Sequence, residues 1–251
     1  LRTTPFISML RLRLPLLFVL ALALNLGLAT PTHAQQGALT LDGDNDYATA
    51  ADPADDDINL AQTSYPIELW VKHDGNSDSD AFLLNKVFSN NKGYSLSFNG
   101  GGEAPTLSFS HTRGGGATVT SSQGIPAGRW THVAVTYDGS AQRMYLNGQL
   151  DATTSTTDAI QQLFDDSVKL WVGSGNGGTS NFFSGQLDNL RIWNDARTAT
   201  EVLNSYFDEL SGSTSELLAL YQFNSSSGGQ VSDLAESHTL TLSGDASVGG
   251  R

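Results

Sequence analysis

Residues 129–150 read "RWTHVAVTYDGSAQRMYLNGQL", and they predict two antiparallel strands joined by a tight turn. Val133 and Val135 alternate with more polar neighbours, which is the period of a strand that buries one face. The pair Asn147-Gly148 then follows a second apolar run. It predicts a type I′ hairpin turn, because both central residues of that turn need positive φ angles.

The same two-residue period recurs along most of the chain from residue 37 onward. Further short runs show it at 67–72, 93–99, 105–112, 168–173, 187–193 and 217–223. Between them lie turn-forming clusters such as "NGGGEAP" and "GSGNGGTS". Many short antiparallel strands at this spacing are typical of a β-sandwich. The expected fold is therefore all-β, with two antiparallel sheets packed face to face.

One segment departs from the strand pattern and predicts a short helix over 198–210. Thr198, with Glu201 three residues later, has the sequence pattern of a capping box. The apolar residues that follow recur on one helical face: Val202, Leu203, Tyr206, Phe207 and Leu210. We expect this helix to close one end of the sandwich with that face.

The first 34 residues have the composition of a signal peptide. Three arginines precede the apolar run "LPLLFVLALALNLGLA", which is short for a membrane span and is followed by small residues. We expect cleavage after Ala34, with Ala29 as the second candidate. The rest of the chain would then be secreted, to the extracellular space, the cell surface or the periplasm. The alternative is an uncleaved membrane anchor.

The chain is strongly acidic and contains no cysteine. Its formal charge is −13, and loss of the three arginines within 1–34 would bring it to −16. Such a charge repels phosphate backbones and anionic membranes, which argues against binding of nucleic acid. Without cysteine, no disulfide stabilises the exported domain.

Taken in order, the segments resemble the laminin G-like, concanavalin A-like jelly-roll domains over residues 37–245. The most specific pieces are the stretch 130–148 and the later "GQLDNLRIW" at 185–193. The resemblance implies a jelly roll of two antiparallel sheets, one of them curved. Residues 246–251 have lost all periodicity, and we interpret them as a linker or a truncated end.

The two ends of this domain are similar in sequence. "ALTLDGD" stands at 38–44 and "TLTLSGD" at 239–245. One short match does not establish a repeat. We interpret the two segments as terminal strands that lie close together in one sheet.

Two polar residues inside predicted strands are expected to have structural roles. His132 alternates away from the apolar face of its strand, and we expect it to be hydrogen-bonded rather than catalytic. Glu68 is a lone carboxylate within a strand. We expect it to pair with an arginine, either Arg191 or Arg143.

The acidic loop "LDGDNDY" at 41–47 raises the question of a metal. An EF-hand is excluded, because Tyr47 and Pro53 stand where the sixth-position glycine and the twelfth-position glutamate belong. The resemblance implies another arrangement, in which an aspartate at the start of the 187–193 strand shares a structural calcium with oxygen atoms near the first strand. The candidate ligands are then Asp42, Gly43 through its carbonyl, Asp46 and Asp188. The alternative is that the acidic loop only forms turns.

Catalytic motifs give little support for an enzyme. Glycoside hydrolysis needs two carboxyl groups that flank the bond, and laminarinase-like hydrolases carry theirs as Glu-x-Asp-x-x-Glu on one strand. No such string occurs here. Polysaccharide lyases of the same fold use Tyr, His and Arg or Gln. The candidates for those roles are His111 with Arg113 and Tyr145 with Arg143, but their spacing is not specific.

We therefore expect a secreted, non-catalytic binding module for extracellular carbohydrate or protein, stabilised by a structural Ca²⁺. Two alternatives stay open: a glycoside hydrolase or polysaccharide lyase on the same fold, and an adhesive unit of a larger cell-surface protein. A sugar site needs an aromatic platform with polar groups around it. The candidates are Phe182, Phe183, Trp171, and His111 with Arg113. Packing within the sandwich would explain each of them equally well.

Overall fold

The computed structural model describes residues 37–51, 58, 60, 64–88, 92–112, 116–158, 168–175 and 177–249. The expected signal peptide and its cleavage sites lie outside the described residues. Within them, the chain forms two antiparallel eight-stranded sheets and one short helix. This confirms the expected all-β sandwich of the jelly-roll type.

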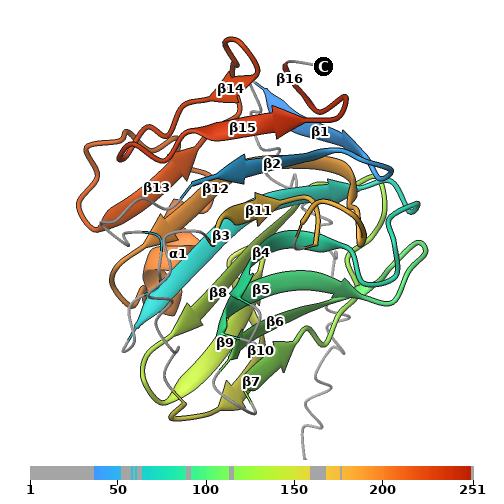
Figure 1. Ribbon diagram of the computed structural model, residues 1–251. Helices are drawn as coiled ribbons and strands as arrows, with labels where there is room; N and C mark the ends of the chain where they lie inside the picture. Colours follow the sequence, from blue (N-terminus) through green and yellow to red (C-terminus); the bar gives the residue numbers. More distant parts are fainter. Residues whose placement is uncertain are drawn as a thin grey trace, which may run out of the picture. The chain divides into compact units, whose positions relative to one another are not determined.

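The two sheets take their strands from distant parts of the chain, and Figure 1 shows β2, β11, β4, β5 and β6 side by side in one of them. Sheet A has the order β10 (Gln149–Ser155), β9 (Ala141–Leu146), β8 (Thr131–Tyr137), β3 (Tyr65–His73), β12 (Ser184–Trp193), β1 (Ala38–Asp42) and β16 (Ser247–Gly249), and β13 (Leu217–Tyr221) also pairs with β12. Sheet B has the order β14 (Gln230–Val231), β15 (Leu240–Ser243), β2 (Tyr47–Ala50), β11 (Leu170–Val172), β4 (Phe82–Phe88), β5 (Lys92–Asn99), β6 (Thr106–Thr112) and β7 (Ala117–Thr120).

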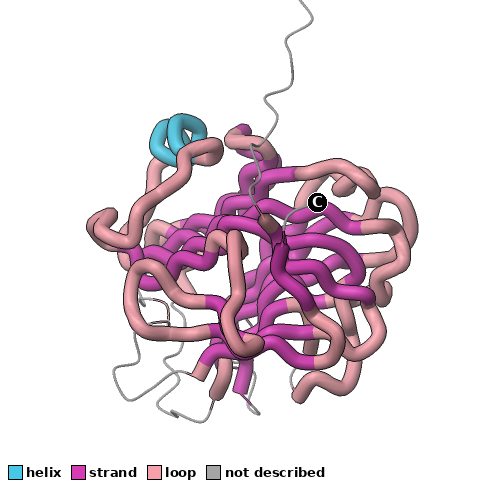
Figure 2. Tube along the Cα trace, turned by 90° about the horizontal axis from the view of Figure 1, so that it is seen from above, coloured by secondary structure: helices cyan, strands magenta, loops and turns pink. Residues whose placement is uncertain are grey.

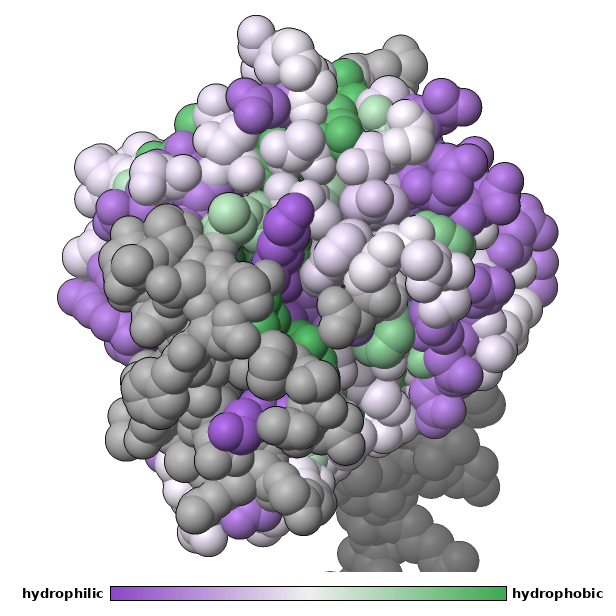
Figure 3. All heavy atoms as spheres, in the orientation of Figure 1, coloured by the Kyte–Doolittle hydropathy of each residue, from purple (hydrophilic) through white to green (hydrophobic). Residues whose placement is uncertain are grey.

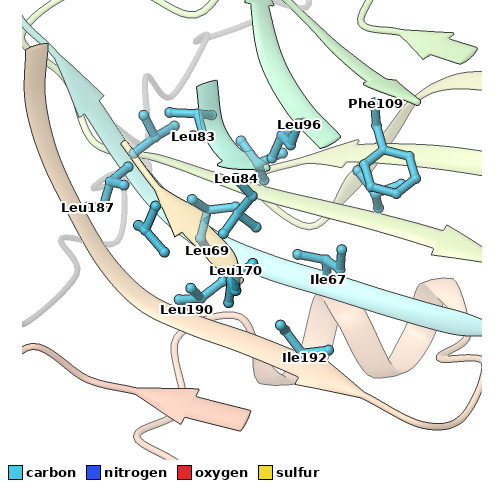
Figure 4. Packing of buried hydrophobic residues seen from close by; sticks show 14 of the residues in the cluster. Ile67, Leu69, Leu83, Leu84, Leu96, Phe109, Leu170, Leu187, Leu190 and Ile192 are labelled. Atoms are coloured by element: carbon cyan, nitrogen blue, oxygen red, sulfur yellow. The ribbon is translucent and has the colours of Figure 1, made fainter. Parts of the chain in front are cut away.

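The core lies between the inner faces of the two sheets. Side chains of opposite sheets meet there, among them Ile67, Leu69 and Ile192 of sheet A and Leu96 and Phe109 of sheet B (Figure 4). These residues are at most 1% exposed. The period of two in each strand places them inside and sends the intervening residues outward. The outer faces of the sheets are therefore where a functional surface can lie.

The predicted hairpin turn joins β9 to β10. Asn147 has a φ of 50° and Gly148 a φ of 77°, as a type I′ turn requires. Leu146 and Gln149 are paired directly across the turn. The sequence prediction at this turn is confirmed.

Helix α1 (Ala199–Ser205) begins where the sequence predicts and ends earlier. Thr198 is the N-cap, and both hydrogen bonds of its capping box with Glu201 are present. The apolar residues beyond Ser205 continue as a loop, so the helix is shorter than the expected 198–210. Val202 packs on Ala134 and Tyr145 of sheet A. The helix therefore covers the outer face of that sheet rather than one end of the sandwich, and Figure 2 shows it outside the strand layers.

A buried ion-pair cluster attaches α1 and its flanking loops to sheet A. The Glu68 carboxylate lies 2.7 Å from Arg197 Nη1 and 3.6 Å from Arg191 Nη1. Arg191 also donates to the carbonyl oxygen of Ser205 at 3.0 Å. The expected pairing of Glu68 with Arg191 is confirmed, whereas Arg143 instead pairs with Asp138 on the surface.

The two ends of the domain differ from our expectation. The segments 38–44 and 239–245 do not share a sheet, since β1 belongs to sheet A and β15 to sheet B. The chain crosses between the sheets at the turn after β1, so β2 is the strand that pairs with β15. The expected linker at 246–251 contains β16, which pairs with β1 from Ala38 to Thr40.

Candidate functional site

A continuous row of side chains crosses the outer face of sheet B. Direct cross-strand partners connect seven positions, one on each strand from β15 to β7. We call them the polar row: Thr241, Thr49, Trp171, Asn85, Ser95, Ser110 and Thr118. Since directly opposed residues point to the same face, the seven side chains form one line perpendicular to the strands.

Strand alternation accounts for the direction in which this row points. Leu96, Phe109 and Val119 are cross-strand partners that fill the core. The serines and threonines next to them along β5, β6 and β7 must therefore face outward. Two hydroxyl pairs confirm this, because Ser110 Oγ lies 2.7 Å from Thr118 Oγ1 and Ser108 Oγ lies 3.0 Å from Thr120 Oγ1 at exposed positions.

An aromatic pair stands within this polar surface. The rings of Trp171 and Tyr47 have centroids 5.2 Å apart at an interplanar angle of 51°, and both residues are half-buried. The glycine-rich loop after β11 lies against them. A Cβ at Gly178 would stand 2.5 Å from the Tyr47 ring and 3.1 Å from the Trp171 ring, so only glycine fits there.

The chemistry of the row is that of neutral hydrogen bonding. None of its side chains ionises at neutral pH. Asn85 lies between Trp171 and Ser95 with 4% of its surface exposed, and its Oδ1 has no hydrogen-bond partner among the described residues. This oxygen is buried beneath the surface of the row, so a ligand that lies on the face does not contact it directly. On the same side of β11, alternation also places Lys169, which is exposed.

Figure 3, in the orientation of Figure 1, shows an area of pale spheres, the colour of residues of intermediate hydropathy, beside a rim with many strongly hydrophilic residues. Serine, threonine, tryptophan and tyrosine all belong to the pale class.

A cleft of about 370 Å³ lies elsewhere, where β1 and β3 end and β12 begins in sheet A. Ser184 Oγ lies at its wall, 2.7 Å from Asp74 Oδ2 and 3.1 Å from the carbonyl oxygen of Asp42. Partial burial alone would raise the pKa of Asp74, but hydrogen bonds from Ser184 and Asn76 outweigh it and hold that pKa below its ordinary value. The polar groups of this cleft therefore already bind one another.

The structure brings together three of the four expected calcium ligands. Asp42, Gly43 and Asp46 share the turn between β1 and β2, where the Asp46 carboxylate accepts hydrogen bonds from the backbone amides of Asp42 and Asp245. Burial raises the pKa of Asp46. Asp46 thus links the first strand to the segment before β16, whereas the metal was expected to link the first strand to the 187–193 strand.

Asp188 does not join this group. Asp42 is opposite Ser184 in the register of β1 and β12, and Asp188 lies four residues further, about 13 Å along the strand. Two ligands of one calcium ion stand within about 5 Å of each other. Asp188 instead accepts a hydrogen bond of 2.7 Å from the backbone amide of Asn189. The four residues therefore do not fit one ion. Among the described residues, no three His, Cys, Asp or Glu side chains converge as metal ligands would.

The other candidates from the sequence occupy separate places. His111 is buried, with its Nδ1 2.6 Å from the hydroxyl of Tyr65, and burial lowers its pKa to about 4. Tyr145 is buried beneath α1, and Arg143 pairs with Asp138. Arg113 lies outside the described residues. Tyr145 and Arg143 share the outer face of sheet A, but α1 covers Tyr145, and His111 is buried away from them.

Of the three expected platform aromatics, the structure leaves Trp171 at the surface. Phe183 is fully buried in the core, and Phe182 is 9% exposed. Sequence reasoning missed Tyr47, Thr49 and Asn85 as parts of the same face. The alternation in β2 and β4 was available as a signal for the direction of these side chains, but not for their proximity to Trp171.

The helix in the described part of the chain is too short and too polar to span a membrane.

The comparisons with known proteins concern most of the described domain. Residues 42–203 match the laminin G family model whose description is concanavalin A-like lectin/glucanases superfamily. Pappalysin-1 of Mus musculus is 24% identical over 161 residues, and pappalysin-1 of Homo sapiens is 22% identical over the same length. Each match covers 59% of this chain and 10% of the relative, so the chain spans about a tenth of the length of the curated relatives it matches.

Two solved structures share the fold. One is a protein of Bacteroides ovatus ATCC 8483 described as carbohydrate-binding, with a TM-score of 0.66, 17% identity, and coverage of 84% of this chain and 59% of that one. The other is a heptameric SAP-like pentraxin from Limulus polyphemus, with a TM-score of 0.57, 15% identity, and coverage of 85% and 94%. At these identities the likeness concerns the fold alone.

Proposed function

The chain belongs to the concanavalin A-like lectin/glucanases superfamily, and on that premise we propose that it is a secreted, non-catalytic module that binds extracellular carbohydrate. Its binding surface is the outer face of sheet B, centred on Trp171 and Tyr47. The Bacteroides ovatus neighbour, described as carbohydrate-binding, supports this class of ligand. The signal-like composition of residues 1–34 supports secretion.

One observation carries the proposal: a half-buried aromatic pair with neutral hydrogen-bonding side chains in register on both sides of it. A sugar ring has apolar C–H faces and a rim of hydroxyl groups. The rings of Trp171 and Tyr47 can pack against such a face, while Thr241 and Ser95, each two strands from Trp171, can exchange hydrogen bonds with the rim. Charged or purely apolar ligands would leave one of these two features unused.

The same geometry favours binding without cleavage. Glycoside hydrolysis needs an acid and a nucleophile or base on opposite sides of the bond, about 5–9.5 Å apart. The polar row contains no carboxylate and no group with a pKa near neutrality. A hydrolase or lyase would need catalytic side chains brought to this face from other parts of the chain.

A retention experiment tests the proposal. Purified protein is run through gels that contain β-glucan, xylan, arabinan, galactomannan or alginate, and the same mixtures are assayed for released reducing ends and unsaturated uronates. We expect retardation by at least one polysaccharide, no products, and loss of retardation in Trp171→Ala. Trp130→Ala is the matched control, because Trp130 is also half-buried but lies beside the other sheet. Its ring centroid lies 6.0 Å from Nζ of Lys72, which is on sheet A.

Each other result has a definite meaning. Product release by the purified protein would replace the binding module with a hydrolase or lyase. Equal loss of retardation in both tryptophan variants would place the ligand elsewhere. Absence of retardation by every polysaccharide would favour the adhesive unit that the sequence left open.

A further inference from the structure

We propose that the ligand is an uncharged oligo- or polysaccharide chain that lies along the polar row, across the strands of sheet B. This inference rests on the proposed function and adds to it the charge class, the minimum length and the direction of the ligand. It follows from the register of the row, from the absence of ionisable side chains within it, and from the position of the aromatic pair.

The length of the row argues for a chain rather than a single sugar. Seven positions on seven strands are separated by six inter-strand steps, which span about 29 Å. Trp171 stands at the third position, and four polar positions extend from it to Thr118 at the edge strand. A monosaccharide on Trp171 would reach only the nearest of these. A longer chain could use Ser95, Ser110 and Thr118 in succession, passing over the buried Asn85.

The charge of the row argues for a neutral ligand. Proteins recognise sulfate, phosphate and carboxylate groups with arginine and lysine, often in bidentate pairs. Polymers with amino groups need carboxylates in return. The polar row supplies neither, and a second line of hydroxyls on the same face, Ser97, Ser108 and Thr120, is equally neutral. Lys169 is one exposed cation beside many hydroxyls, and the negative charge of the chain further disfavours anionic polymers.

The hydrogen-bonding capacity of the row matches sugar hydroxyls, which both donate and accept. Serine and threonine hydroxyls have the same dual capacity. The hydroxyl pairs at Ser110–Thr118 and Ser108–Thr120 each use one hydrogen and leave the other available.

The experiment uses calorimetric titration with the polysaccharide retained in the gel assay and its oligosaccharides of increasing length. We expect affinity to rise with length and then level off, to change little between low and high salt, and to fall about tenfold or more in Trp171→Ala. Lys169→Ala should bind as the parent does. Alginate, polygalacturonate and dextran sulfate, which are anionic, and chitosan, which carries amino groups, should not compete.

The variant Ser110→Arg tests the path of the ligand. Ser110 lies three strands from Trp171, about 14 Å away. An arginine there should lower the affinity for long oligosaccharides several-fold and leave the affinity for the shortest unchanged. Ser213→Arg, at an exposed position in the loop between α1 and β13, is the matched control and should change the affinity for neither short nor long oligosaccharides. Equal effects of Ser110→Arg on short and long ligands, or none, would overturn the path along the row.

The remaining outcomes separate this inference from the proposed function. Binding of an anionic polymer that depends on Trp171, weakens with salt and is lost in Lys169→Ala would overturn the neutral class and leave the binding module standing. A single sugar that binds as tightly as any oligomer would overturn the extended ligand in the same way. Absence of binding to every carbohydrate would overturn both.

Discussion

Arg197 Nη1 donates a 2.7 Å hydrogen bond to Glu68 Oε1 beneath α1, although the Glu68 side chain is completely buried. His132 Nε2 and Arg191 Nη1 each lie 3.6 Å from the other carboxylate oxygen. Burial alone would raise the pKa of Glu68, but the interactions with His132, Arg197 and Arg191 outweigh it and keep that pKa below its ordinary value. The cluster attaches α1 to sheet A by charge rather than by apolar contact alone.

Glu68→Gln should lower the free energy of unfolding by about 3–5 kcal/mol, because it leaves the buried Arg191 without its anionic partner. Urea unfolding followed by tryptophan fluorescence measures the change. The control is Arg143→Ala, which removes a partly exposed ion pair with Asp138 and should cost no more than about 1 kcal/mol. Equal losses in the two variants would mean that the Glu68 cluster contributes no more than a surface pair.

The stability of the domain should depend on His111 in mildly acidic solution. Burial lowers the pKa of His111 from 6.5 to about 4, so the folded protein keeps the ring neutral while the unfolded chain protonates it below about pH 6.5. The stabilisation that comes from the neutral His111 ring is thus complete above pH 6.5 and decreases as the pH falls toward 4. Between pH 7 and pH 5, protonation of His111 in the unfolded chain should lower the free energy of unfolding by about 2 kcal/mol.

The measurement compares urea unfolding at the two pH values for the parent and for His111→Gln. The glutamine variant should lose about 2 kcal/mol less than the parent over this interval, since its side chain does not titrate. An identical pH dependence in both proteins would show that His111 is not the group responsible.

Any stabilisation of the domain by calcium at these residues should come from the turn between β1 and β2 and should not need Asp188. We expect the shift in melting temperature between calcium and chelator to be the same in Asp188→Asn as in the parent, because Asp188 lies about 13 Å along β12 from the residue opposite Asp42. Asp42→Asn is the comparison variant within the turn. A calcium shift that disappears in Asp188→Asn would restore the ligand set that the resemblance implied.

Local sequence signals predicted local structure well in this chain. Asn147-Gly148 defined the hairpin between β9 and β10, and Thr198 with Glu201 defined the start of α1. Both rest on interactions between residues at most three positions apart. The sequence also predicted an arginine partner for Glu68 and named Arg191, which lies 3.6 Å away, but it missed Arg197, which makes the 2.7 Å hydrogen bond.

The candidate site depends on information that alternation does not contain. A period of two places Thr49, Asn85 and Trp171 on an outer face, but it does not say that β2, β4 and β11 are neighbours. For the same reason, Asp188 and Asp42 looked compatible with one ion until the register of β1 against β12 separated them. The similar ends of the domain were assigned to one sheet because nothing in "DGDND" indicates that the chain crosses there to the other.

The last prediction concerns the fit of the glycine-rich loop on the aromatic pair. Gly178 and Gly177 both have positive φ angles, 62° and 90°, so alanine at either position carries a similar backbone strain. They differ in their surroundings. A Cβ at Gly178 would stand 2.5 Å from Tyr47, whereas a Cβ at Gly177 would meet nothing within 4 Å. Gly178→Ala must therefore displace either the loop or the Tyr47 ring, and Gly177→Ala need displace neither. We expect Gly178→Ala to bind the retained polysaccharide at least about tenfold more weakly than Gly177→Ala, with unfolding free energies within about 1 kcal/mol of each other. Calorimetric titration and urea unfolding of the two variants give both quantities. Equal affinities would show that the ligand does not depend on the arrangement of Tyr47 and Trp171, and the binding surface would then have to be sought away from the aromatic pair.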